Sequence, residues 1–230
     1  MIAGLPARER GAVLELAAER TFPPDALLLD DARRCLFVEQ GLASLHVPVG
    51  DHLSGSVGLI GPGGLLGLPS LMGYSAPVHQ AVAVTGWGVV VFLPADLHRL
   101  LGGLPVLRRL LSAYVNHRFM QALAASACNL EHGLGPRLSD WVLQASGPLG
   151  EAVIPVTHDK LASILGATRP SITLALQSLE EGKLIRSRRG HVEVLDAGGL
   201  RARACGCGSG TRWVIPRPSA QRQEAGRTVG

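Results

Sequence analysis

The spacing of apolar residues divides the chain into two parts. Up to about residue 95 they form short runs separated by glycine, proline and polar residues, which is typical of short strands. The runs are Leu27–Leu29, Cys35–Val38, Gly41–Val47, Ser56–Ile60, Ala81–Val84 and Gly88–Leu93. Beyond residue 105, apolar residues recur at the spacing of one helix face. The pattern predicts a first half built of strands and a second half rich in helices.

The close spacing of the strand-like runs predicts an antiparallel, jelly-roll-like β-roll. A glycine-rich segment, residues 61–67, lies between two of the runs. A phosphate-binding loop would end in Lys-Ser/Thr and would join a strand to a helix. Neither feature is present here, so we interpret these residues as turn glycines.

A long helix is predicted from about Val106 to Leu130. Its first half carries an apolar stripe, and residues 122–128 are mostly small, which permits close helix approach. Gly133, Gly135 and Pro136 predict its end and a hinge. Taken alone, the stripe fits either a core helix or a helix that pairs with its own copy.

Residues 157–176 have the pattern of a helix-turn-helix. Leu161 and Leu165 would face the core of the domain, and Gly166 falls where the chain reverses and a left-handed backbone is needed. Thr168 can cap the second helix, which we expect to start near Arg169. The same pattern also describes an ordinary helical hairpin.

The following residues favour a winged helix over an ordinary hairpin. A helix stopped by Gly182 leads into a short strand, a basic turn with Arg188, Arg189 and Gly190, and an alternating strand to Leu195. The predicted fold class is therefore α+β: an N-terminal antiparallel β-roll, a long helix, and a C-terminal winged helix-turn-helix.

With these motifs in view, residues 157–200 resemble the DNA-binding domain of the Crp/Fnr family of bacterial transcription regulators. The shared pattern is Leu-Ala, Gly, Thr-Arg, Leu-Glu, Gly, Leu-Ile and a final Asp-x-x-x-Leu, here Asp196 to Leu200. The likeness extends upstream through residues 137–143 and loosely over the first half. It implies a homodimer on double-stranded DNA, with contact to RNA polymerase if the protein is an activator. It also implies four regions: a β-roll sensor (1–104), a dimerisation helix and hinge (105–132), a DNA-binding domain (133–200) and a tail (201–230).

The resemblance implies a set of DNA-contacting residues. The start of the second helix would enter the major groove with Arg169 on a guanine edge. The full set is Thr157, Thr168, Arg169, Ser171, Thr173, Arg188 and Arg189. Many family members project Arg, Glu and Arg onto a TGTGA-like half-site, whereas Pro170 and Leu174 occupy the second and third places here. We therefore expect a different half-site in a similar inverted repeat.

The effector pocket implied by the resemblance is degenerate. Cyclic-nucleotide binders of the family place a Glu for the ribose after the glycine matching Gly67, and an Arg-Ser pair for the phosphate before the alanine matching Ala81. The corresponding residues here are Leu68, His79 and Gln80, and Ala122 and Leu123 replace the Thr-Ser pair that reads adenine. A buried phosphate needs a fixed cation. We expect that cyclic AMP and cyclic GMP are not the effectors.

The resemblance also places the dimer interface on the long helix. The residues that it assigns are Leu107, Leu111, Tyr114, Val115 and Ala122. The effector itself stays open: a haem- or metal-dependent sensor and a ligand-independent regulator with a degenerate roll are both alternatives.

The sequence gives little support for other cofactor sites or for a catalytic site. An oxygen-sensing iron–sulfur cluster needs several clustered thiolates, and Cys35 stands alone near the N-terminus. His79 is the candidate haem ligand. Cys128 and His132 supply only two of the four ligands of a structural zinc site, so we expect hinge packing and capping there and assign no metal ligand. A cupin-type metalloenzyme is disfavoured because His46 and His52 lack the clustered partners, and we assign no catalytic residue.

Composition adds two expectations. The net charge of the 230 residues is +4, and the excess lies in residues 201–230, with six arginines and one acid, so we expect a disordered basic tail there. The scattered cysteines fit reduced thiols. The N-terminus lacks a signal-peptide pattern and no long apolar run occurs, so we expect a cytoplasmic bacterial protein without a membrane span.

Overall fold

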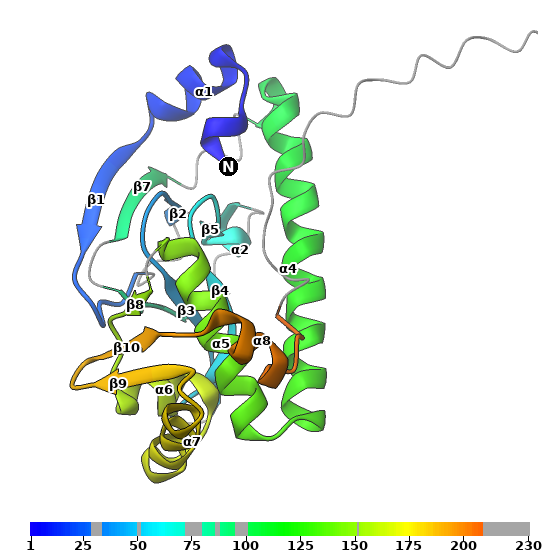
Figure 1. Cartoon of the computed structure of the whole chain (residues 1–230). Helices are drawn as coiled ribbons and strands as arrows, with labels where there is room; N and C mark the ends of the chain where they lie inside the picture. The colour runs from blue at the N-terminus through cyan, green and yellow to red at the C-terminus, as the bar shows by residue number, and fades with distance from the viewer. Residues whose placement is uncertain are drawn as a thin grey trace, which may run out of the picture.

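A computed structural model describes residues 1–28, 34–49, 52–71, 80–85, 88–94, 101–150 and 152–208 of the chain. Figure 1 shows a strand-rich roll, a long helix α4 along one side of the molecule, and a helical domain below the roll. The fold class predicted from the sequence is confirmed. In the described part of the chain, no helix is both long enough and apolar enough to cross a membrane.

The roll consists of two antiparallel sheets. One has the strand order β1-β7-β2-β5, and the other has the order β4-β3-β6. The strands are β1 Ala18–Phe22, β2 Arg34–Val38, β3 Ala43–Val49, β4 His52–Ile60, β5 Leu65–Leu66, β6 Gln80–Ala83 and β7 Gly88–Pro94. Leu36 and Val38 of one sheet pack against Ala43, Ile60 and Ala81 of the other, because strand side chains alternate between the two faces.

A second core joins the roll to the start of the long helix. The helices are η1 Ile2–Gly4, α1 Ala7–Leu14, α2 Leu68–Leu71, η2 Leu101–Gly103 and α4 Pro105–Glu131. The Glu9 carboxylate of α1 accepts hydrogen bonds from the free amides of Val106 (3.0 Å) and Leu107 (2.8 Å). A carboxylate at a helix N-terminus satisfies orphan amides and complements the helix dipole. This cap fixes where α4 begins.

The apolar stripe of α4 faces the same chain's own roll. Leu107 (0% exposed), Leu111 (5%) and Tyr114 (1%) lie in the core with Phe37 and Leu65. The Tyr114 hydroxyl donates to the Leu65 carbonyl (3.0 Å) and accepts from the Leu65 amide (3.0 Å). These three side chains, which we expected in the dimer interface, are instead internal to one protomer.

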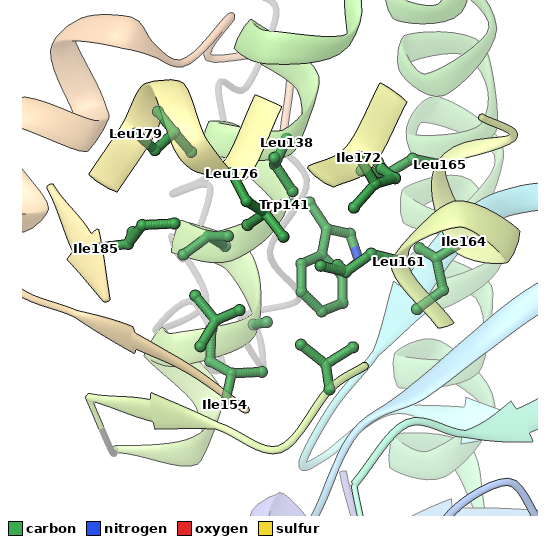
Figure 2. Packing of buried hydrophobic residues seen from close by; sticks show 14 of the residues in the cluster. Leu138, Trp141, Ile154, Leu161, Ile164, Leu165, Ile172, Leu176, Leu179 and Ile185 are labelled. Atoms are coloured by element: carbon green, nitrogen blue, oxygen red, sulfur yellow. The ribbon is translucent and has the colours of Figure 1, made fainter. Parts of the chain in front are cut away.

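The C-terminal part is a winged helix-turn-helix, as predicted. Its elements are α5 Leu134–Leu149, β8 Val153–Ile154, α6 His158–Leu165, α7 Arg169–Glu181, β9 Ile185–Arg188, β10 His191–Val194 and α8 Ala197–Arg203. The strands form one antiparallel sheet in the order β8-β10-β9. Figure 2 shows Leu161, Ile172 and Leu176 converging with Leu138 on the Trp141 ring. This packing fixes α6 and α7 relative to α5.

The winged helix packs directly on the roll. Leu42 and Val84 of the roll belong to the core cluster of the winged helix. A Cβ placed on Gly55 of β4 would lie 3.0 Å from the Gly166 amide nitrogen, so the strand touches the turn of the helix-turn-helix. Lys160 of α6 forms an ion pair with Asp25 of the roll.

Three details differ from the sequence predictions. Leu27 forms a single bridge with Val82, and Leu29 lies outside the described residues. We expected a disordered tail to begin at residue 201. Residues 201–208 instead continue the folded domain, through the end of α8 and a loop that is hydrogen-bonded to Pro136. Gly135 and Pro136 lie in the first turn of α5 and do not form a separate hinge.

Candidate DNA-binding face, cavity and cysteine cluster

The turn between α6 and α7 has the geometry that the sequence predicted. Gly166 is left-handed (φ 60°), and Thr168 caps α7 by accepting from the Ser171 amide at 3.4 Å. The Thr168 and Ser171 hydroxyls are themselves 2.9 Å apart. Pro170 occupies the first turn, where an amide has no helical partner. These contacts aim the N-terminal end of α7 outward.

Arg169 is the exposed cation at this end. Its side chain is 66% exposed, and its Nε lies 3.5 Å from Oδ1 of Asp159, which is 68% exposed. An exposed pair of this kind contributes little to stability. Arg169 is therefore free to exchange this partner for a base or a phosphate.

His158 links the two helices to the wing. Its Nδ1 lies 3.0 Å from Thr173 Oγ1, and its Nε2 lies 3.2 Å from Ser187 Oγ. The Thr173 hydroxyl donates to the Arg169 carbonyl (3.1 Å), which leaves its oxygen to accept from the ring. Glu180 accepts from the Ser187 amide at 2.6 Å. Thr173 is thus engaged in holding the scaffold together.

The wing carries two exposed arginines at its tip. β9 and β10 pair in register from Arg188–His191 to Ile185–Val194, and Gly190 turns with φ 84°. Arg188 and Arg189 are both exposed. Thr157 caps α6 by accepting from the Lys160 amide at 3.2 Å and is exposed as well. The structure therefore brings the predicted DNA-contacting residues to the turn, the α7 N-terminus and the wing.

The residues predicted for the effector pocket are not brought together. Gly67 is buried and Leu68 packs against the core beneath α4, while Gln80 pairs with His46 in the other sheet. Ala122 and Leu123 are exposed on α4, and His79 lies outside the described residues. These positions do not form one pocket in this arrangement.

A different cavity lies between the roll, α4 and the winged-helix domain. Its volume is about 480 Å³, and its walls include Tyr114, Arg118 and Gln121 of α4 together with Asp140 and Gln144 of α5. Arg118 donates to the Leu59 carbonyl at 3.3 Å and to Gln121. Burial lowers the pKa of the Arg118 guanidinium, although an arginine stays protonated at neutral pH. The cavity therefore presents a partly desolvated cation.

Four side chains that the sequence did not connect meet at the other end of α4. Cys128 and His132 lie at the end of α4, and Cys205 and Cys207 lie in the loop after α8. Their ligand atoms all lie within 4.8 Å of one another. The Cys-x₃-His and Cys-x-Cys spacings were the available signals, but only the fold shows that they belong together.

Comparison with known proteins agrees with this geometry. The model of the Crp-like helix-turn-helix domain matches residues 136–203. A curated relative, the cyclic AMP receptor protein of Thermus thermophilus, is 29% identical over 162 residues, which is 67% of this chain and 73% of that protein.

Solved structures show the same fold. FixK2 from Bradyrhizobium japonicum superposes with a TM-score of 0.69 at 16% identity, covering 82% of this chain and 97% of that chain. A transcriptional regulator of the CRP/FNR family from Thermus thermophilus gives a TM-score of 0.63 at 24% identity, covering 81% of this chain and 98% of that chain. The matched domain and the shared architecture lead to one conclusion: the chain has the fold of the Crp/Fnr transcriptional regulators, with a Crp-like helix-turn-helix domain at residues 136–203.

Proposed function

We propose that this protein is a homodimeric, sequence-specific DNA-binding regulator that reads bases with the N-terminal end of α7. The observation that carries the proposal is the exposed Arg169 at the start of a helix whose opposite face is buried. Ile172, Leu176 and Leu179 are at most 3% exposed, so α7 cannot rotate to present another face. A fixed helix with an outward N-terminus is how this motif enters a major groove.

The side chains divide into base contacts and phosphate contacts. Arg169 pairs with a guanine edge, because a guanidinium matches the two acceptors of guanine in the major groove. Thr157, Thr168, Arg188 and Arg189 hold phosphates, and Ser171 stays available beside Arg169. Thr173 supports the site through His158 rather than through a base.

The half-site differs from TGTGA in this proposal. Pro170 cannot accept a hydrogen bond from cytosine. Leu174 is 67% exposed and offers only apolar contact, such as to a thymine methyl. An exposed leucine on a DNA-binding helix fits a contact of that kind.

The dimer forms along an exposed line of α4. Phe119 (60% exposed), Leu123 (49%) and Leu130 (86%) follow the spacing of a coiled-coil seam, and Met120 (54%) lies beside them. Pairing two copies here covers these side chains and places the two α7 helices about one DNA turn apart. Val115 is half-buried and Ala122 is exposed, so both can border this seam.

The effector is not a cyclic nucleotide in this proposal. Leu68 and Gln80 offer no charge to a ribose or a phosphate. The cavity beside Arg118 is a better place for a small anionic effector, since groups of both the roll and the DNA-binding domain line it. An occupant there would change how the two parts fit together.

Selection of bound duplexes from random-sequence DNA tests the proposed function. The full chain should enrich an inverted repeat with half-site centres about one helical turn apart, and its half-site should differ from TGTGA. Recovery of TGTGA would contradict the assignment of Pro170 and Leu174. Enrichment of single half-sites would contradict the dimer, and no enrichment at all would contradict sequence-specific binding.

A further inference from the structure

The cysteine cluster has the composition of a structural zinc site. Three thiols and one imidazole meet where the end of α4 touches the last loop of the DNA-binding domain. They come from segments far apart in sequence, and Figure 1 shows α8 beside the lower part of α4. Sulfur and imidazole are the ligands that Zn²⁺ uses in closed, four-coordinate sites.

The separations fit a single ion. Cys128 Sγ lies 3.5 Å from Cys205 Sγ, and Cys207 Sγ lies 3.7 Å from His132 Nδ1. Zinc–sulfur and zinc–nitrogen bonds of about 2.3 and 2.0–2.1 Å give a tetrahedron with edges of about 3.6–3.8 Å. These two separations match the edges of such a tetrahedron, and all four ligand atoms lie within 4.8 Å of one another.

Two other uses of these thiols fit less well. The four cysteines are free, and the sulfur separation of 3.5 Å is a non-bonded contact, far from the roughly 2.05 Å of a disulfide. An iron–sulfur cluster distributes its ligands over two or more irons, so ligands on different irons would lie farther apart than they do around one ion.

The backbone holds the second pair of thiols in place without help from the cluster. The Cys205 amide donates to the Pro136 carbonyl at 3.3 Å, and the Gly208 amide donates to Asp140 Oδ2 at 2.8 Å. A Cβ on Gly208 would meet the Gln144 side chain, so the loop lies against α5. The ligand set is therefore preorganised, which reduces the ordering that metal binding would require.

We propose that Cys128, His132, Cys205 and Cys207 bind one zinc ion per chain. The ion ties the end of the dimerisation helix to the loop after α8 and so fixes the angle between α4 and the DNA-binding domain. Because α4 sets the spacing of the two copies, an ion at this joint also constrains the positions of the two α7 helices. The site is separate from the DNA-binding face, and its loop borders the cavity through Ala204, Gly206 and Gly208.

The test measures metal content and coordination in the full reduced chain. Protein purified without chelator is analysed for zinc, iron and other metals by mass spectrometry, and metal-free protein is then titrated with Zn²⁺ and with Co²⁺. We expect one zinc per chain, and visible cobalt bands of the intensity given by tetrahedral thiolate ligation. Restoring zinc should also raise the melting temperature, since an ion that binds only the folded state stabilises it.

Variants separate the site from nonspecific binding. Cys207→Ser and His132→Ala should each weaken zinc binding by more than about 100-fold, since loss of even an outer-shell partner costs about 10- to 100-fold. Asn129→Ala removes an exposed neighbour on α4, and Cys35→Ala removes a buried thiol outside the cluster. Both control variants should keep one zinc per chain. Circular dichroism distinguishes a lost site from a lost fold.

Several outcomes would overturn the proposal. These are a bound iron–sulfur cluster, a Cys128–Cys205 disulfide in freshly purified protein, and a cobalt spectrum without thiolate bands. Zinc binding that persists in both ligand variants would also overturn it. DNA selection reports on the proposed function independently, so failure of the zinc site would leave that function standing.

Discussion

At the scale of the residue, the proposal that the effector is not a cyclic nucleotide rests on Leu68 and Gln80. We predict that cyclic AMP and cyclic GMP at micromolar concentration give no saturable heat in calorimetry and do not tighten operator binding. The physical reason is that a buried cyclic phosphate needs a charged, bidentate partner, which a neutral amide cannot replace. The Thermus thermophilus cyclic AMP receptor protein serves as the positive control. Saturable micromolar binding coupled to tighter DNA binding would contradict the prediction.

Residues with strong local roles could be identified from the sequence. Gly166 was expected at a left-handed turn and Thr168 at a helix cap, and both are found there. At the end of α7, however, Gly182 is right-handed and Lys183 takes the left-handed conformation (φ 55°). Local sequence patterns predict where such a turn lies. They do not predict which of two adjacent residues adopts the left-handed conformation.

At the scale of the element, α4 has one face buried against the roll and one exposed apolar line, which we propose is covered by a second copy of the chain. We predict that Leu123→Glu raises the dimer dissociation constant by at least about 30-fold, equivalent to the ~2 kcal/mol of an interface hot spot. In a two-fold dimer the introduced carboxylates would lie close together on the seam. Analytical ultracentrifugation measures the change. Leu195→Glu, at a leucine of similar exposure (45%), should leave the dimer intact.

A dimeric Leu123→Glu variant would contradict the seam. From the sequence, Leu107, Leu111 and Tyr114 were assigned to the interface, but they are buried within one chain. The apolar stripe and the line of Phe119, Leu123 and Leu130 both have helical spacing, and only the packing of the roll shows which one is already buried.

Elements with strong periodicity were easier to predict than short or polar ones. β2, β3, β4, β6 and β7 lie where the apolar runs placed them. β1, Ala18–Phe22, was missed because it is mostly polar and exposed at the edge of its sheet, and β5 has only two residues. Their pairing depends on neighbouring strands rather than on their own composition.

At the scale of the whole molecule, the roll and the helix-turn-helix are in close contact at Gly55. We predict that Gly55→Ala destabilises the protein by about 1–3 kcal/mol, the usual cost of overpacking. The added Cβ would lie 3.0 Å from the Gly166 amide nitrogen and 3.1 Å from its Cα, and backbone cannot move aside cheaply. Chemical denaturation measures the change.

Gly11→Ala is the matched control for Gly55→Ala. A Cβ on Gly11 meets nothing within 4 Å, so this variant of helix α1 should be stabilised by about 0.5–1 kcal/mol. Equal stability of Gly55→Ala and the unmodified protein would show that β4 and the turn do not touch in solution.

Contacts between distant segments were the least predictable feature. Cys128 and Cys205 are separated by 77 positions, and Cys207 and His132 by 75. No local pattern spans such distances. The cavity is a similar case, because its walls come from the roll, α4, α5 and the region of α8.

A base-by-base comparison of Arg169→Ala and Arg189→Ala on the selected operator tests the central claim most directly. Affinities are measured for the operator and for each single base-pair substitution, at several salt concentrations. Arg169→Ala should cost about 1–3 kcal/mol and abolish discrimination at one position of each half-site. Arg189→Ala should weaken all sequences alike and reduce the salt slope by about one. If both variants lose the same affinity for operator and random DNA, with discrimination unchanged at every position, α7 does not read the sequence through Arg169.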